Sequence, residues 1–265
     1  MITLDKGITV YFGYLGDFKE RLLRIKNAGF TCVTTAIDHK FEWQNGKLAK
    51  QVKLIKKVGL KLSSLHASYD SQMLKNLFED NEAGEQITKT LISEVKLAKK
   101  YGFTSLVIHL DGVGSQIGID RLNRVLNVCK KCKMPLAVEN NNDSKIIDYV
   151  FKHIDNSYLC FCYNSGHNHC FDPKKDYLKE YGHRLVALHL NDNNGDSDQH
   201  TLNQYGTIDW DKIAKGLAHS NLASLDYELL MHKHGAKITE ELTLSLCYKN
   251  ACKLEKAIKK EILKK

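Results

Sequence analysis

Six strand-length apolar runs in this chain each end in side chains that can bind metal ions or protons. The ends of these runs are marked by His66, His109, Glu139, Asn164 with His167, His189 and Glu228. Segments with the periodicity of amphipathic helices separate the runs. In a (β/α)8 barrel, the loops that follow the parallel strands meet at one mouth, where catalytic side chains gather. The pattern therefore predicts such a barrel, with a metal-dependent site at its mouth.

The whole chain divides into eight strand–helix units. The expected strands cover residues 8–14, 30–38, 60–68, 105–111, 135–140, 158–167, 185–192 and 223–230. Four of them follow a glycine in the position where helices commonly end, namely Gly29, Gly59, Gly102 and Gly182. Alternating strands and helices predict a parallel sheet, and eight of them predict its closure. We therefore expect an α/β protein with a single (β/α)8 TIM barrel domain over residues 1–265.

The sequence shows no feature of a membrane or secreted protein. No apolar stretch approaches the roughly 18 residues of a membrane span, and the first residues lack a basic segment followed by a continuous apolar one. Among eight cysteines, Cys129 and Cys132 form a C-x-x-C pair, but no second pair could complete a zinc ribbon. We expect free thiols in a reducing cytoplasm, and no membrane partner.

The formal net charge of +8 raises the question of nucleic-acid binding. Seven of the lysines lie at or after Lys249 and give that segment a net charge of +5, so that little excess charge remains elsewhere. Apolar residues recur there at helical spacing, at Cys247, Ala251, Leu254, Ile258 and Ile262. The lysines therefore form the solvated face of a terminal helix outside the barrel. Nucleic acid is not the expected partner, although the charge alone does not exclude it.

The side chains at the predicted mouth combine imidazole with carboxylate, which suits zinc, manganese or iron. Asp198 and His200 form an Asp-x-His pair in the loop after the seventh strand, where both can project the same way. Three groups could each hold an ion: His66 with His109 and Glu139; Glu139 with Asn164, His189 and Glu228; and His167 with Asp198 and His200. The expected cofactor is a divalent metal, zinc or manganese.

These residues resemble the xylose-isomerase-like TIM barrel superfamily, which includes sugar phosphate isomerases and epimerases and endonuclease IV-type enzymes. The resemblance covers essentially the whole chain and is clearest from the third to the eighth strand. In the isomerase branch one divalent ion is bound by Glu, Asp, His and Glu, which implies Glu139, Asn164, His189 and Glu228 here. In the endonuclease branch three zinc ions use that set and further ligands, which implies His66, His109, His167, Asp198 and His200 as well.

Two segments depart from the family pattern. The family sequence Asp-x-x-His is replaced by Asn164-Ser165-Gly166-His167. An amide oxygen can coordinate a metal but carries no negative charge, so we expect weaker binding or a softer Lewis acid at the central position. After His200, the family sequence Pro-Gly-x-Gly keeps only its last glycine, Gly206.

Three functions are compatible with this sequence. The first, which we expect, is an isomerase or epimerase of a small sugar, sugar phosphate or related polyol, in which Glu139 and Glu228 move protons as general base and acid. The second is an endonuclease IV-like zinc phosphodiesterase acting on abasic DNA, although no basic or intercalating loop is evident. The third is a ligand-binding barrel whose catalysis is impaired, which Asn164 suggests. The expected partner is a sugar-like small molecule, and a homo-oligomer is left open.

Overall fold

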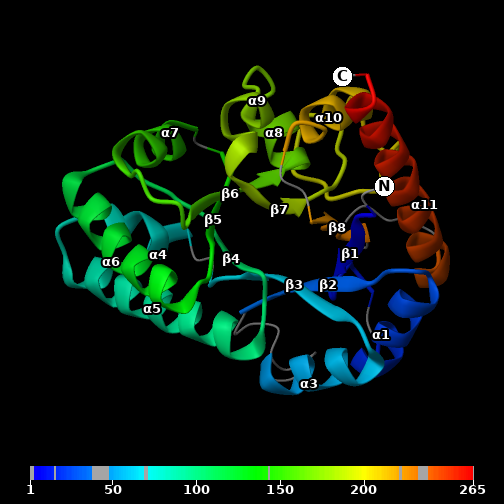
Figure 1. The fold of residues 1–265 in the computed structure, drawn as a ribbon, viewed down its shortest axis with the longest axis horizontal. Coiled ribbons are helices and arrows are strands. Elements are labelled where there is room, and N and C mark those ends of the chain that lie inside the picture. The colour runs from blue at the N-terminus through cyan, green and yellow to red at the C-terminus, as the bar shows by residue number, and fades with distance from the viewer. Residues whose placement is uncertain are drawn as a thin grey trace.

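The computed structural model describes residues 3–264, except for residues 15, 38–47, 69–70, 143, 221–222 and 232–237. Eight parallel strands lie at the centre of the molecule and helices surround them (Figure 1). The strands are β1 (Asp5–Thr9), β2 (Cys32–Ala36), β3 (Lys61–His66), β4 (Ser105–Ile108), β5 (Leu136–Glu139), β6 (Leu159–Asn164), β7 (Leu185–His189) and β8 (Ser224–Tyr227). The predicted (β/α)8 architecture is confirmed.

The sheet closes between its first and last strands. β1 pairs in parallel with both β2 and β8, and the remaining strands follow in the order of the sequence. Between β7 and β8 a parallel bridge joins Leu190 to Tyr227. There, Leu190 N donates to Asp226 O over 2.9 Å and Glu228 N donates to Leu190 O over 3.0 Å. This closure brings the end of β8 beside the end of β7.

The outer layer is formed by helices whose apolar faces pack on the outward side chains of the strands. These helices are α1 (Phe18–Asn27), α3 (Leu48–Val58), α4 (Ser71–Lys75), α5 (Glu82–Tyr101), α6 (Gln116–Cys132), α7 (Ser144–His153), α8 (Ser165–Phe171), α9 (Tyr177–Tyr181), α10 (Trp210–Leu217) and α11 (Glu240–Ile262), with two short 3₁₀ turns, η1 (Asn76–Phe78) and η2 (Gly182–Arg184). The main hydrophobic core lies between this layer and the sheet. None of the described helices is long and apolar enough to cross a membrane.

The predicted terminal helix corresponds to α11. Its apolar positions Cys247, Ala251, Leu254 and Ile258 are buried, whereas Ile262 is 39% exposed. The predicted helix end at Gly102 is also present, because this residue has a φ of 89° and ends α5. A left-handed backbone favours glycine, which has no Cβ to clash with the preceding turn.

A small apolar layer fills the middle of the barrel. Val107, Ala137, Cys162 and Ala187 come from β4, β5, β6 and β7 and form a cluster separate from the main core. Val107 lies opposite Ala137 and Cys162 lies opposite Ala187, whereas the register between β5 and β6 places Cys162 opposite Glu139. Side chains on a strand alternate between faces, so the next inward side chain lies two residues later. In these four strands that position is His109, Glu139, Asn164 or His189. The polar site therefore lies directly above the apolar layer.

An irregularity in β3 determines where His66 points. Leu62 and Leu65 both belong to the main core although they are three residues apart, and the register against β2 shifts between them. The bulge adds one residue to β3, so that the side chains after it point to the opposite face from the one that regular alternation would give. Ser63, before the extra residue, and His66, after it, therefore both face the barrel interior. Regular alternation from Leu62 would turn His66 outward.

Several predicted strands, including the fourth, seventh and eighth, ran past the ends that the structure gives them, and the first and sixth differ for identifiable reasons. The first strand was predicted at residues 8–14 but runs from Asp5 to Thr9. The strand begins with charged residues, which are not expected in a buried strand. Lys6 can be buried there because it forms a 2.7 Å ion pair with Glu255 of α11. The sixth strand was predicted at 158–167 but ends at Asn164, where α8 begins. The Asn164 side chain accepts a hydrogen bond from His167 N and so acts as the N-cap of that helix.

Candidate metal centre

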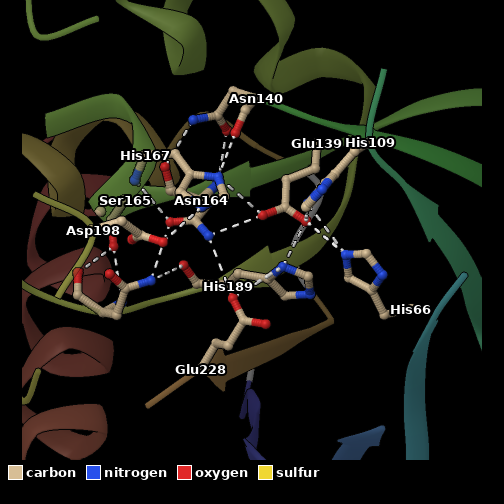
Figure 2. Close-up of polar contacts among 12 residues, drawn as sticks. His66, His109, Glu139, Asn140, Asn164, Ser165, His167, His189, Asp198 and Glu228 are labelled. Carbon is tan, nitrogen blue, oxygen red and sulfur yellow. Dashed lines mark hydrogen bonds and ion pairs between the residues drawn. The ribbon is translucent and has the colours of Figure 1, made fainter. Parts of the chain in front are cut away.

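All nine predicted site residues come together at the carboxyl ends of the strands; Figure 2 labels all of them except His200, which lies beside Asp198. Strands β3, β5, β6 and β7 end at His66, Glu139, Asn164 and His189, and the residues directly after β4 and β8 are His109 and Glu228. His167 lies in the first turn of α8, and Asp198 and His200 lie in the loop between β7 and α10. The sequence analysis had grouped these residues by their positions at the ends of predicted strands and in one loop, and the barrel geometry explains why they meet.

Glu139 lies at the centre of this group and its side chain is only 1% exposed. Its Oε2 atom is 2.8 Å from His189 Nδ1, 3.2 Å from His109 Nε2 and 3.5 Å from His66 Nε2. Among the described residues, no nitrogen is aligned to donate a good hydrogen bond to this oxygen. A buried carboxylate oxygen needs a compensating partner, and one surrounded by imidazole nitrogens has the surroundings of a metal ligand.

We call His66, His109 and Glu139 the first flanking group. Its three ligand atoms form a triangle, since His66 Nε2 is 3.3 Å from His109 Nε2 and both lie 3.2–3.5 Å from Glu139 Oε2. Tetrahedral zinc, with bonds of about 2.0–2.1 Å, places its ligand atoms about 3.3 Å apart. The spacing of this group therefore fits zinc.

We call His167, Asp198 and His200 the second flanking group. Asp198 Oδ2 lies 2.7 Å from His200 Nε2 and 3.4 Å from His167 Nε2. His200 has a φ of 52°, which is uncommon outside glycine, and an antiparallel bridge between Asp192 and Thr201 holds the backbone next to it. The loop thus holds His200 in an uncommon backbone conformation. In this conformation the side chains of Asp198 and His200 both face α8, which carries His167.

Backbone carbonyls orient three of the histidines. His66 Nδ1 lies 2.8 Å from Ala67 O, His167 Nδ1 lies 2.9 Å from Asn140 O, and His200 Nδ1 lies 3.0 Å from Glu228 O. A carbonyl oxygen only accepts hydrogen bonds, so each Nδ1 donates, and in the neutral form of each imidazole Nε2 presents its lone pair to the site. Histidines that ligate metals are held in this way, with the nitrogen opposite the ion hydrogen-bonded to the protein.

The acidic and basic side chains of the site shift one another's pKa values. Burial alone would raise the pKa of Glu139, but the charges of His189 and His109 hold it well below its ordinary value. Burial would lower the pKa of His167, but its hydrogen bond to Asp198 and the charge of Glu139 raise it to about 9. Burial also raises the pKa of Asp198, yet His167 and His200 reverse this effect and lower it. The carboxylates are therefore ionised, and some histidines hold protons that a bound cation would displace.

The structure adds asparagines that the sequence analysis did not assign to the site. Asn140 and Asn191 are fully buried and hydrogen-bond to the backbone and the side chain of Asn164, respectively. Cys162 also contacts His189 from the apolar layer below and helps raise the pKa of that histidine. The runs of asparagine after the fifth and seventh strands were a usable signal, because a buried amide at a strand end requires hydrogen-bonding partners.

With the geometry established, comparison with known proteins identifies the family. A family model described as the xylose isomerase-like TIM barrel matches residues 22–245. The chain belongs to this family. The family resemblance inferred from the sequence is thereby confirmed.

The proteins that are similar to this chain differ widely from it in sequence. A curated relative, "Uncharacterized protein y4fM" of Sinorhizobium fredii, is 24% identical over 249 residues, which cover 79% of this chain and 80% of the relative. A crystal structure of a D-tagatose 3-epimerase-like protein superposes with a TM-score of 0.77 at 11% identity, covering 98% of this chain and all of the other. The D-allulose 3-epimerase of a Methylomonas species gives 0.70 at 12% identity, covering 95% and 98%. At such identities the structures show a shared fold.

Proposed function

We propose that this barrel is a divalent-metal-dependent isomerase or epimerase of a small sugar, sugar phosphate or related polyol. The observation that carries the proposal is the buried Glu139 carboxylate, surrounded by imidazole nitrogens and facing the second carboxylate, Glu228, across Asn164. The epimerases among the similar structures support the substrate class.

The residues around Glu139 fit a divalent cation. His66, His109 and Glu139 have the spacing of zinc ligands, and His189 approaches the same carboxylate oxygen. When bound, zinc or manganese would polarise oxygen atoms of the substrate and acidify the hydrogen on the carbon beside them. The protein supplies the ligands and excludes water, because the apolar layer closes the barrel below Glu139.

The two glutamates are suited to different parts of a proton transfer. The Glu228 side chain is 27% exposed and lies 3.5 Å from His189 Nδ1. It is placed to remove a proton from a substrate entering the mouth. Glu139, on the other side of the Asn164 amide, would return a proton to the opposite face of the same carbon after taking one from His189, whose Nδ1 lies 2.8 Å from its Oε2. The proton held by Glu228 would then pass back to His189. Movement of a proton between two positioned carboxylates suits epimerisation.

One observation favours a second candidate function. The second flanking group is a complete set of three ligands, which an isomerase using a single ion does not need. A zinc phosphodiesterase of the endonuclease IV type, acting on abasic DNA, would use several ions to generate hydroxide and stabilise the leaving oxygen. Phosphodiester hydrolysis by the zinc-loaded protein, without exchange of any sugar hydrogen, would favour this candidate.

Substitution of Glu228 by glutamine tests the proposed function. Zinc- or manganese-loaded protein is incubated with a panel of ketoses, aldoses and their phosphates in D₂O, and incorporation of deuterium at carbon is followed by NMR. We expect Glu228→Gln to slow exchange at least about 100-fold, because the amide cannot accept the proton. Glu241→Gln makes the same change on α11 at a side chain that is 66% exposed, and should exchange normally. Undiminished exchange in Glu228→Gln would remove Glu228 from the mechanism.

A further inference from the structure

We propose that the Asn164 amide takes the place of a central metal ion, so that this barrel binds ions only in its two flanking groups. The central position is the one that the family resemblance assigns to Glu139, Asn164, His189 and Glu228. This inference rests on the part of the proposed function that has the site bind divalent cations. It does not depend on the substrate.

The orientation of the Asn164 amide is determined by an obligate donor. Its Oδ1 atom accepts a hydrogen bond from the backbone N–H of His167 over 3.0 Å. A backbone N–H can only donate, so the atom facing it must be oxygen. A rotation of the amide by 180° would set its hydrogens against that N–H. Because Asn164 is fully buried, water could not relieve the clash.

Asn191 secures the same orientation from the next strand. Its Nδ2 atom donates to Asn164 Oδ1 over 3.1 Å. Asn191 is itself held at both backbone groups, since its N–H donates to Ser165 Oγ over 3.0 Å and the Ser165 hydroxyl donates to its carbonyl over 2.7 Å. A Cβ on Gly166 would lie 1.9 Å from Asn191 Oδ1, so glycine leaves the space that this side chain needs. Asn191 is therefore a positioning residue.

The amide nitrogen consequently faces the two glutamates. Asn164 Nδ2 is 2.9 Å from Glu139 Oε1 and 3.4 Å from Glu228 Oε2 (Figure 2). An amide nitrogen has no lone pair for a metal, and its hydrogens carry partial positive charge. It therefore stabilises the two carboxylates as a hydrogen-bond donor, where a cation would otherwise be required. An aspartate would instead turn a third carboxylate oxygen toward them, and the cluster would then need a cation.

The flanking groups do not need Asn164. In the first, the ligand atoms of His66, His109 and Glu139 lie 3.2–3.5 Å apart, with His189 beside Glu139. The second is complete in His167, Asp198 and His200. In Figure 2, Asn164 lies between the side that holds His66 and His109 and the side that holds Asp198. Two ions per chain are therefore expected. Glu228, which would ligate only a central ion, remains available to exchange protons.

Titration of zinc into the metal-free protein tests this inference. Isothermal titration calorimetry, with metal analysis after gel filtration, should give two equivalents for the wild type and three for Asn164→Asp. Asn194→Asp makes the same change in an exposed loop residue and should stay at two. Circular dichroism checks that each variant is folded, and if Asn164→Asp does not fold, the wild-type count and the variants described next decide the question.

Two further variants locate the ions. His200→Ala should lower the count to one because it dismantles the second flanking group, whereas Glu228→Gln should keep two. A wild-type count of three, or a lower count in Glu228→Gln, would show a central ion and overturn the inference while leaving the proposed function intact. Binding of no zinc by any of the proteins would overturn the proposed metal dependence and the inference together.

Discussion

The barrel interior buries two carboxylates, Glu139 and Asp226, and the two are held in opposite ways. At the mouth, Glu139 lies among imidazole nitrogens and its pKa is lowered. Below the mouth, on β8, Asp226 Oδ2 accepts hydrogen bonds from Ser63 and Ser224 over 2.7 and 2.6 Å, and the Cys32 thiol lies 3.5 Å from Oδ1. Burial raises the pKa of Asp226, and these neutral donors do not fully offset it.

This difference distinguishes a carboxylate that contributes to the packing of the fold, Asp226, from one that is available to bind a ligand, Glu139. The polar partners of Asp226 are neutral hydrogen-bond donors, and a Cβ on the neighbouring Gly7 would lie 1.8 Å from its Oδ1, so the surroundings of Asp226 are closely packed. Glu139 instead has an oxygen to which no described residue donates a well-aligned hydrogen bond, at the end of the barrel where catalytic groups gather. We therefore expect changes at Glu139 to alter metal binding and changes at Asp226 to alter stability.

The largest effect is expected from Glu139→Gln. This change removes the charge that the first flanking group shares, while nearly preserving the shape of the side chain. Zinc affinity of that group should fall at least about 100-fold, since even loss of a residue that only supports a metal ligand costs 10–100-fold. Calorimetric titration measures the loss. Asp226→Asn is the matched control and should bind zinc like the wild type. Equal losses of zinc affinity in both variants would contradict the different roles assigned to the two carboxylates.

A smaller effect, about tenfold per pH unit, is expected for zinc binding to the second flanking group. His167 has a pKa of about 9 in the metal-free protein and keeps its proton below that pH. Zinc binds the neutral imidazole, so each bound ion must displace this proton, and affinity should rise with pH up to about 9. Burial lowers the pKa of His109, so that histidine imposes no such penalty on the first flanking group.

Titrations at pH 7, 8 and 9 measure this difference. The His200→Ala variant isolates the first flanking group, and subtraction from the wild type gives the second. The same pH slope for both groups would contradict the prediction.

The smallest effect is expected from Asp226→Asn, which should raise the free energy of unfolding at neutral pH by about 1 kcal/mol. The pKa of Asp226 is raised in the folded protein above its ordinary 3.8, so the unfolded chain loses this proton first as the pH rises. The folded state then binds more protons than the unfolded state, and stability falls through that window. The variant should lack this fall. Urea unfolding of both proteins at several pH values measures it, and a variant less stable than the wild type at pH 7 would show that the charged form is favoured.

The strand–helix units and the location of the site could be predicted from the sequence alone. The alternation of apolar runs and amphipathic segments predicted eight strand–helix units, because periodicity depends only on neighbouring residues. The position of polar residues at strand ends predicted the mouth, since parallel strands end on one side. For this reason even Asp198 and His200, which lie in a loop, could be placed with His167.

Other features were decided only by the tertiary structure. The bulge in β3 that turns His66 inward depends on the register against β2, which the sequence of β3 does not reveal. The direction of the Asn164 amide depends on the His167 N–H and on Asn191, which is 27 residues away. From sequence, an asparagine in place of aspartate offers either an oxygen or a nitrogen to the site. Only the fold supplies the donors that choose between them, because hydrogen bonds between distant segments form only when the barrel closes.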